Sequence, residues 1–171
     1  MKKTILTSLL IAGSLVAGSL TANKRGIAPV SDSFYMKECA SCHFAYQPGL
    51  LPSRSWEKLM GNLSNHFSTD ASLEPADNKI ILNYLIKNSA ENSTDYKRSK
   101  KINDSIPKNE TPISLTETKY FIKKHKGIPV RLIEQKEVKS LANCMACHTT
   151  ADTGSYSERA IKIPNYGKWE D

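Results

Sequence analysis

Four cysteines and two of the four histidines of this 171-residue chain form one pentapeptide that occurs twice. The pattern Cys-x-x-Cys-His runs from Cys39 to His43 and again from Cys144 to His148. This spacing is the attachment signature of c-type haem, in which two thiols form thioethers with one porphyrin and the next histidine binds the iron. No cysteine is left over, so the sequence predicts two covalently bound haem c groups. The predicted attachment residues are Cys39, Cys42, Cys144 and Cys147, and the predicted motif ligands of iron are His43 and His148.

Paired cysteines have two other uses that spacing alone leaves open. Two Cys-x-x-Cys pairs can hold one structural zinc ion, or each pair can act as a redox disulfide. The histidine directly after each pair, together with two further histidines in the chain, argues against both.

Each iron needs a second axial ligand, and its identity decides the function. A vacant position lets small molecules bind, a methionine raises the reduction potential, and a second histidine leaves it lower. Only His66 and His125 remain, one in each half of the chain. His66 lies on the apolar edge of a predicted helix and is favoured for the first iron, with Met60 on the same face as the competing ligand.

His125 lies among lysines, and periodicity alone would place it at the surface. The second half has no methionine beyond Met145, which is inside its own motif, and this absence favours His125 as the second distal ligand. Two bis-histidine irons suit electron transfer better than substrate chemistry, because both axial positions are filled. The sequence therefore predicts an electron carrier and not an enzyme; the alternative is a haem enzyme or gas-binding protein with one labile distal ligand.

The first 22 residues have a basic start and an apolar stretch, which is typical of a secretory signal peptide. Ala22 is the favoured last residue of the signal, with Ser19 as an alternative, and an uncleaved N-terminal anchor is the other interpretation. Either way we expect a periplasmic protein, the compartment in which bacteria attach c-type haem. The formal net charge of +7, or +5 without Lys2 and Lys3, favours an acidic redox partner. Export makes a nucleic-acid partner unlikely.

The rest of the chain predicts a mainly α protein in two haem units, residues 30–90 and 113–171, joined by a polar linker at 91–112. Helices are predicted at 33–39, 55–67, from about 75, at 116–126 and at 134–147, and the tail from 161 has no helical periodicity. The 48–52 loop is expected to supply a carbonyl for a motif histidine, and Arg54 either pairs with a propionate or is solvated.

Several segments beyond the two motifs resemble the bacterial dihaem cytochrome c family. These segments are residues 38–52, 54–56, 65–67, 116–125, 143–148 and 161–164. The resemblance covers nearly all of residues 33–165. It implies an N-terminal domain like class I cytochrome c, followed by a smaller and less regular haem-binding C-terminal domain.

The same resemblance implies bis-histidine ligation, carried here onto His43 with His66 and onto His148 with His125. It also implies a periplasmic carrier that takes electrons from a b-type membrane cytochrome and donates them to a small oxygen-binding monohaem cytochrome. We expect a monomer. Lysines cluster at 97–101 and at 123–126, the second cluster around His125. We therefore expect an acidic partner to exchange electrons through the second haem.

Overall fold

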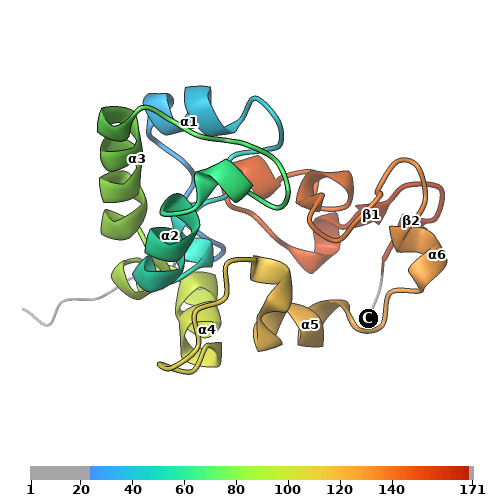
Figure 1. The fold of residues 1–171 in the computed structure, drawn as a ribbon. Coiled ribbons are helices and arrows are strands. Elements are labelled where there is room, and N and C mark those ends of the chain that lie inside the picture. Colours follow the sequence, from blue (N-terminus) through green and yellow to red (C-terminus); the bar gives the residue numbers. More distant parts are fainter. Residues whose placement is uncertain (1–23, 170–171) are drawn as a thin grey trace, which may run out of the picture.

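The computed structural model describes residues 24–169, and the predicted signal peptide lies outside them. The described residues form six α-helices, several single turns of 3₁₀-helix and one two-stranded hairpin (Figure 1). The helices are α1 (Ser33–Cys39), α2 (Ser53–Met60), α3 (Pro75–Lys87), α4 (Lys97–Ser105), α5 (Lys119–His125) and α6 (Val130–Ile133), and the strands are β1 (Lys162–Ile163) and β2 (Gly167–Lys168). The prediction of a mainly α protein is confirmed. No helix within residues 24–169 is both long enough and apolar enough to cross a bilayer.

Helices α1, α2 and α3 enclose the first core. Asp32 begins α1 by accepting a hydrogen bond from the Tyr35 amide at 2.7 Å. Pro75 begins α3 at the predicted position. Helix α2 packs against α3. The buried side chains of this core are Tyr35, Ala45, Leu51, Trp56, Met60, Leu63, Ile81 and Leu85.

Helix α2 is shorter than the predicted helix at 55–67. It ends at Met60, where the Gly61 amide donates to the Glu57 carbonyl, and a 3₁₀ turn follows at Leu63–Asn65. Glycine and asparagine are poor helix formers, so Gly61 and Asn62 explain the early end. His66 therefore lies in a turn and not on a helix.

The segment predicted as a polar linker, 91–112, contains a helix in its central part, α4. Two residues of α4 are fully buried, Ser99 at 0 % and Ile102 at 1 % exposure. Ile102 belongs to a second core that draws side chains from every part of the chain: Ile27, Leu50, Ile106, Cys144, Ala151 and Tyr156. A short polar helix is stabilised by such packing and not by its own propensity, which is why its pattern looked like a connector. The division into two haem units remains a prediction.

The predicted helix at 134–147 does not form. The chain has only α6 before it and a 3₁₀ turn, Cys144–Ala146, at its end. Lys139 takes a left-handed conformation with φ 67°, and the Asn143 side chain donates to the Val138 carbonyl at 3.1 Å. Local bonds of this kind compete with a helix, because asparagine can satisfy a carbonyl that a helix would use.

A polar contact chain ties the early part of the chain to the late part. The Tyr156 hydroxyl donates to Gln47 Oε1 at 2.6 Å, and the Gln47 side-chain amide donates to the Ala151 carbonyl. Gln47 is fully buried. The tail forms the hairpin of β1 and β2, and the Lys162 amide donates to the Cys147 carbonyl at 3.0 Å, which fixes the hairpin to the second motif.

Candidate haem sites

The first motif begins at the last residue of α1 and continues into the loop that follows it. Cys39 is half-buried, whereas Cys42 and His43 are exposed. Cys144 and Cys147 lie in and just after the 3₁₀ turn of the second motif. All four cysteines are free thiols, as covalent attachment to haem requires.

The structure disfavours a zinc site at these cysteines. Among residues 24–169, no group of three or more metal-binding side chains comes together, so the four cysteines are not gathered around one metal position. Burial raises the pKa of the Cys39 and Cys144 thiols to about 11, so these two thiols are protonated at neutral pH.

His43 and His66 face each other although 23 residues separate them in sequence. Their ring centres lie 6.1 Å apart and the ring planes differ by 23°. His43 Nδ1 lies 2.8 Å from the Phe44 carbonyl oxygen, which can only accept, so Nδ1 carries the proton and Nε2 keeps a lone pair for a metal. The Phe44 carbonyl therefore has the role that we expected of the 48–52 loop; the Pro48 carbonyl accepts from Trp56 Nε1 instead.

A tight turn positions His66. The amides of His66 and Thr69 each donate to the other residue's carbonyl, at 2.8 and 3.0 Å. Between them, Phe67 and Ser68 both have positive φ, 51° and 69°, the conformation that a two-residue hairpin turn requires. Met60, the competing ligand, is packed into the first core and also lines a cavity next to His43 and His66.

His125 and His148 form a second facing pair, also with ring centres 6.1 Å apart, but with planes at 75°. His125 projects from α5 and stacks on Phe121 with 3.8 Å between ring centres. Its Nδ1 lies 2.8 Å from the Phe121 carbonyl oxygen, so Nε2 again keeps the lone pair. His148 Nδ1 is buried without a hydrogen-bond partner.

The spacing of both pairs suits one iron between two imidazoles. A metal–nitrogen bond of about 2 Å on each side, and about 1 Å from each nitrogen to its ring centre, places two axial rings roughly 6 Å apart. Burial lowers the pKa of His148 to about 4, and burial also lowers the pKa of His66. Both shifts favour the neutral imidazole, which is the form that binds metal.

Each histidine pair borders a cavity. The cavity at the first pair has a volume of about 880 Å³, the size of a cofactor site. The cavity at the second pair is smaller, with a volume of about 100 Å³. The two cavities share a wall made of Leu50, Leu115, Phe121 and Cys144.

Arg98 is a residue of the second cavity that sequence analysis missed. It comes from α4 and donates to the Tyr120 hydroxyl and to the Tyr156 carbonyl, both at 2.9 Å. Its Nε is buried without a partner, and its charge contributes to the lowered pKa of His148. A guanidinium with an unused N–H suits a carboxylate such as a haem propionate. In the sequence it was one of several basic residues in an apparent linker, and no local signal distinguished it.

Arg54, which we considered for a propionate, has other partners. It donates to the carbonyls of Glu110 and Pro107, at 2.8 and 3.0 Å. Its role in the structure is to hold the segment after α4 against α2.

Comparison with known proteins identifies close relatives of this arrangement. The sequence profile described as dihaem cytochrome c matches residues 35–156. A solved diheme cytochrome c from Shewanella baltica OS155 is 34 % identical, with a TM-score of 0.67 and coverage of 81 % of this chain and 97 % of that one. A diheme cytochrome c from Rhodobacter sphaeroides is 38 % identical, with a TM-score of 0.67 and coverage of 75 % and 99 %. No curated protein matches the chain.

Proposed function

The chain belongs to the dihaem cytochrome c family and carries two haem c groups, and from this premise we propose that it is a periplasmic electron carrier with two bis-histidine irons. The observation that carries the proposal is the pairing of all four histidines into two facing pairs with the same 6.1 Å separation. Two filled axial positions at each iron leave no site for a substrate, so the protein is a carrier and not an enzyme.

The residues have separate tasks in this proposal. Cys39 and Cys42 anchor one porphyrin, and Cys144 and Cys147 anchor the other. The haem supplies a one-electron iron couple when bound, and the protein sets its potential through axial ligands, burial and nearby charge. His43 with His66, and His148 with His125, would hold the two irons from both sides, and ligands kept in both oxidation states would make structural change during electron transfer small.

The shared wall between the cavities supports electron transfer from one haem to the other. Phe121 belongs to this wall and also stacks on His125, so it contacts a ligand of the second iron. The same four residues line both cavities, so the two sites are adjacent. We propose that electrons enter at one haem and leave at the other across this wall.

The location and partners are proposed on sequence grounds. The first 22 residues resemble an export signal, and the bacterial family to which the chain belongs implies the periplasm. The family resemblance also supports a b-type membrane cytochrome as donor and a small oxygen-binding monohaem cytochrome c as acceptor. We propose that the mature protein is a monomer with no nucleic-acid partner and no stable membrane insertion.

Optical and electron paramagnetic resonance spectra of the purified holoprotein test the ligand sets. We expect two low-spin haems that do not bind carbon monoxide readily when reduced. Parallel imidazole planes split the iron dπ orbitals and perpendicular planes leave them nearly degenerate, so the angles of 23° and 75° predict two distinct low-spin signals when the protein is oxidised. A high-spin signal, or rapid carbon monoxide binding, would instead support a gas-binding protein or haem enzyme with a labile ligand.

A further inference from the structure

The positive charge of the protein is concentrated in one stretch that includes α4 and α5. Residues 97–126 contain nine Lys or Arg and three Asp or Glu, a net charge of +6. All the other described residues, 24–96 and 127–169, contain thirteen Lys or Arg and twelve Asp or Glu, a net charge of +1. The segment 30–90, which forms the first histidine pair, contains five Lys or Arg and six Asp or Glu. The positive charge is therefore in the segment that supplies His125 of the second pair, and not in the segment of the first pair.

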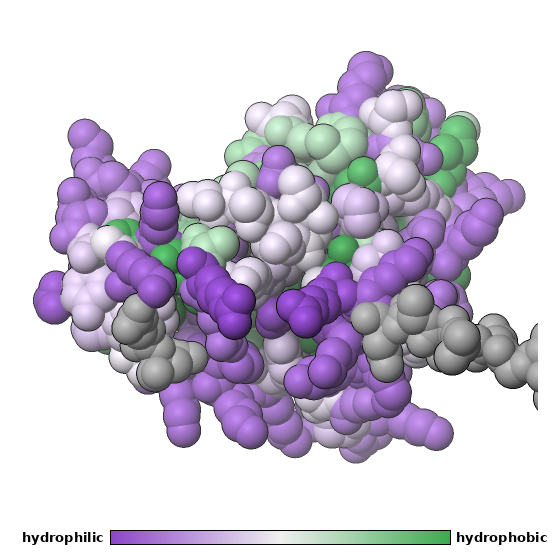
Figure 2. All heavy atoms as spheres, turned by 180° about the vertical axis from the view of Figure 1, so that it is seen from behind, coloured by the Kyte–Doolittle hydropathy of each residue, from purple (hydrophilic) through white to green (hydrophobic). Residues whose placement is uncertain are grey.

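The fold gathers this charge on one face, because α4 packs against α5. The lysines of both helices are exposed, and we call this surface the α4–α5 face: Lys97, Lys100, Lys101, Lys119, Lys123, Lys124 and Lys126. Helices α4 and α5 lie at the bottom of the molecule in Figure 1, and hydrophilic side chains line the same edge in the view from behind (Figure 2).

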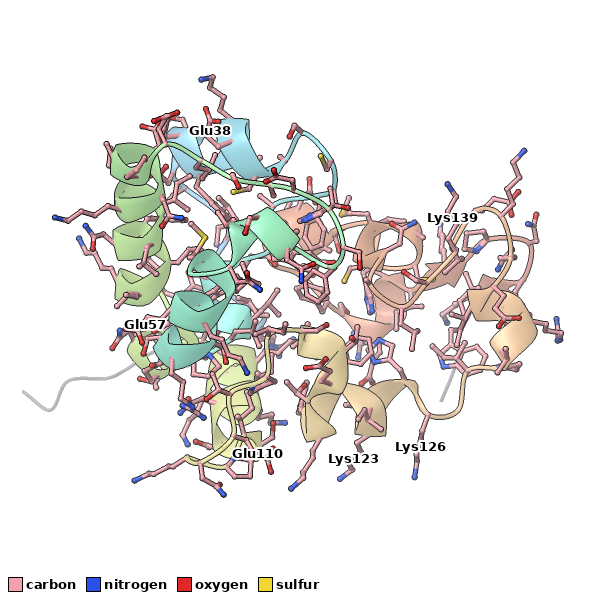
Figure 3. The ribbon with its side chains drawn as sticks, viewed as in Figure 1. Glu38, Glu57, Glu110, Lys123, Lys126 and Lys139 are labelled. Carbon is pink, nitrogen blue, oxygen red and sulfur yellow. The ribbon has the colours of Figure 1, made fainter. Side chains whose placement is uncertain are left out.

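Nearby acids neutralise only part of the face. Lys100 pairs with Asp104 at 2.6 Å, Lys119 with Glu110 at 3.7 Å and Lys124 with Glu158 at 2.7 Å. Lys123 and Lys126 are in no salt bridge among the described residues. Both extend from α5 away from the body of the protein, whereas Glu38 and Glu57 come from α1 and α2 on the side of the first site (Figure 3).

An apolar side chain lies among these lysines. Ile122 is 53 % exposed on α5. Lys119 and Lys126 are three residues before and four residues after it, so helical spacing places them beside it on the surface. An exposed apolar residue within a charged ring is the arrangement of a small protein interface, in which the apolar centre is desolvated and the rim steers.

The side of α5 that carries Phe121 and His125 belongs to the second iron site, where Phe121 is buried and His125 lies beside His148. Exposed Ile122 is three residues before His125, and Lys124 lines the second cavity, so this surface adjoins the predicted ligand. A partner that touches the outer side of α5 is therefore brought close to the second haem.

We propose that the α4–α5 face is the docking surface for an acidic redox protein, which exchanges electrons through the second haem. The proposal rests on the proposed function as an electron carrier. Charge complementarity selects the partner: the face attracts an acidic surface at long range, whereas the first cavity is lined by Glu38, Asp70 and Glu117 and by no Lys or Arg. Steering of this type raises association rates by about 10-fold to 1,000-fold at low salt.

The test is stopped-flow electron transfer from the reduced holoprotein to a purified monohaem cytochrome c of negative net charge, over a salt series. We expect the second-order rate constant to fall by about 10-fold or more from low to high salt, because screening shortens charge attraction to about 10 Å at roughly 0.1 M. The double variant Lys123→Gln with Lys126→Gln should lose about 3-fold or more at low salt. The matched control, Lys58→Gln with Lys87→Gln, removes two exposed lysines of α2 and α3 and should change the rate by less than about 2-fold.

Rates that do not depend on salt, or a double variant as fast as the wild type, would overturn the proposal. Binding to phosphatidylglycerol vesicles that the double variant loses, with its protein transfer rates unchanged, would assign the face to an anionic membrane instead and also overturn it. These failures are distinct from failure of the carrier function, because the spectra of both haems would still be low-spin and insensitive to carbon monoxide.

Discussion

The two iron sites bring histidines to the same separation by different structural means. At the first site the predicted distal ligand, His66, begins a tight turn after a helix has ended, and its ring is nearly parallel to that of His43. At the second site the distal residue, His125, projects from α5, stacks on Phe121 and is nearly perpendicular to His148. The shared motif therefore sets the attachment chemistry, and the surrounding structure sets ring orientation, burial and charge separately for each haem.

The two sites also differ in nearby charge and in exposure to solvent. At the second site the motif histidine, His148, is largely buried, and Arg98 lines the cavity. At the first site the motif histidine, His43, is exposed. Burial and nearby charge tune a haem potential. Under the proposed bis-histidine ligation, two haems with the same ligands but different surroundings would have different potentials.

The largest expected effect is from removal of one distal ligand. His66→Ala should make the first haem high-spin and open to carbon monoxide while the second stays low-spin, and His125→Ala should do the reverse. Absorption spectra of each variant, with and without carbon monoxide, measure this. The control is Met60→Leu, which should leave both spectra unchanged and cost less than about 1.5 kcal/mol of stability, because the volume is conserved. If Met60→Leu abolishes a sulfur-to-iron band instead, Met60 and not His66 is the first distal ligand.

A smaller effect, on one site only, is expected from Arg98→Gln. Loss of a positive charge next to the second cavity stabilises the oxidised iron, so the potential of the second haem should fall while that of the first stays the same. A spectroelectrochemical titration of the two haems measures both. Arg54→Gln is the matched control, because Arg54 donates only to backbone carbonyls of the chain. Equal shifts at both haems would mean that Arg98 acts through general surface charge.

The smallest effect concerns the turn of the first site. Ser68 has φ 69°, which a residue with a side chain adopts at a cost. Ser68→Gly should therefore raise the free energy of unfolding by about 1 kcal/mol or less, with no change in the second haem. Ser64→Gly, in the 3₁₀ turn just before His66, should lower it by about 0.5–1 kcal/mol, because glycine there adds only chain entropy in the unfolded state. Chemical denaturation of the holoprotein gives both values. A Ser68→Gly protein that is less stable than the wild type would show that the backbone at Ser68 is not strained.

Local patterns identified the helices whose signals lie within a few residues. Pro75 at the start of α3 is such a signal, and α1 and α3 both form as predicted. The same approach failed at α4 and at 134–147. In α4 the helix depends on burial of Ile102 against residues from distant parts of the chain, and in 134–147 the backbone turns at Lys139 despite a regular apolar spacing.

By itself, the sequence determined the chemistry of this protein: two haem attachment motifs, four cysteines with no remainder, and one further histidine for each motif. Those conclusions need only residue types and short spacings, because thioether attachment takes place within five residues. The tertiary structure alone decided the angle between the rings of each pair, the place of Arg98 in the second wall and the contact between Gln47 and Tyr156. Each of these is a contact between residues that are tens of positions apart in the sequence. Such contacts form because side chains from separate helices are buried against one another, and no local pattern encodes them.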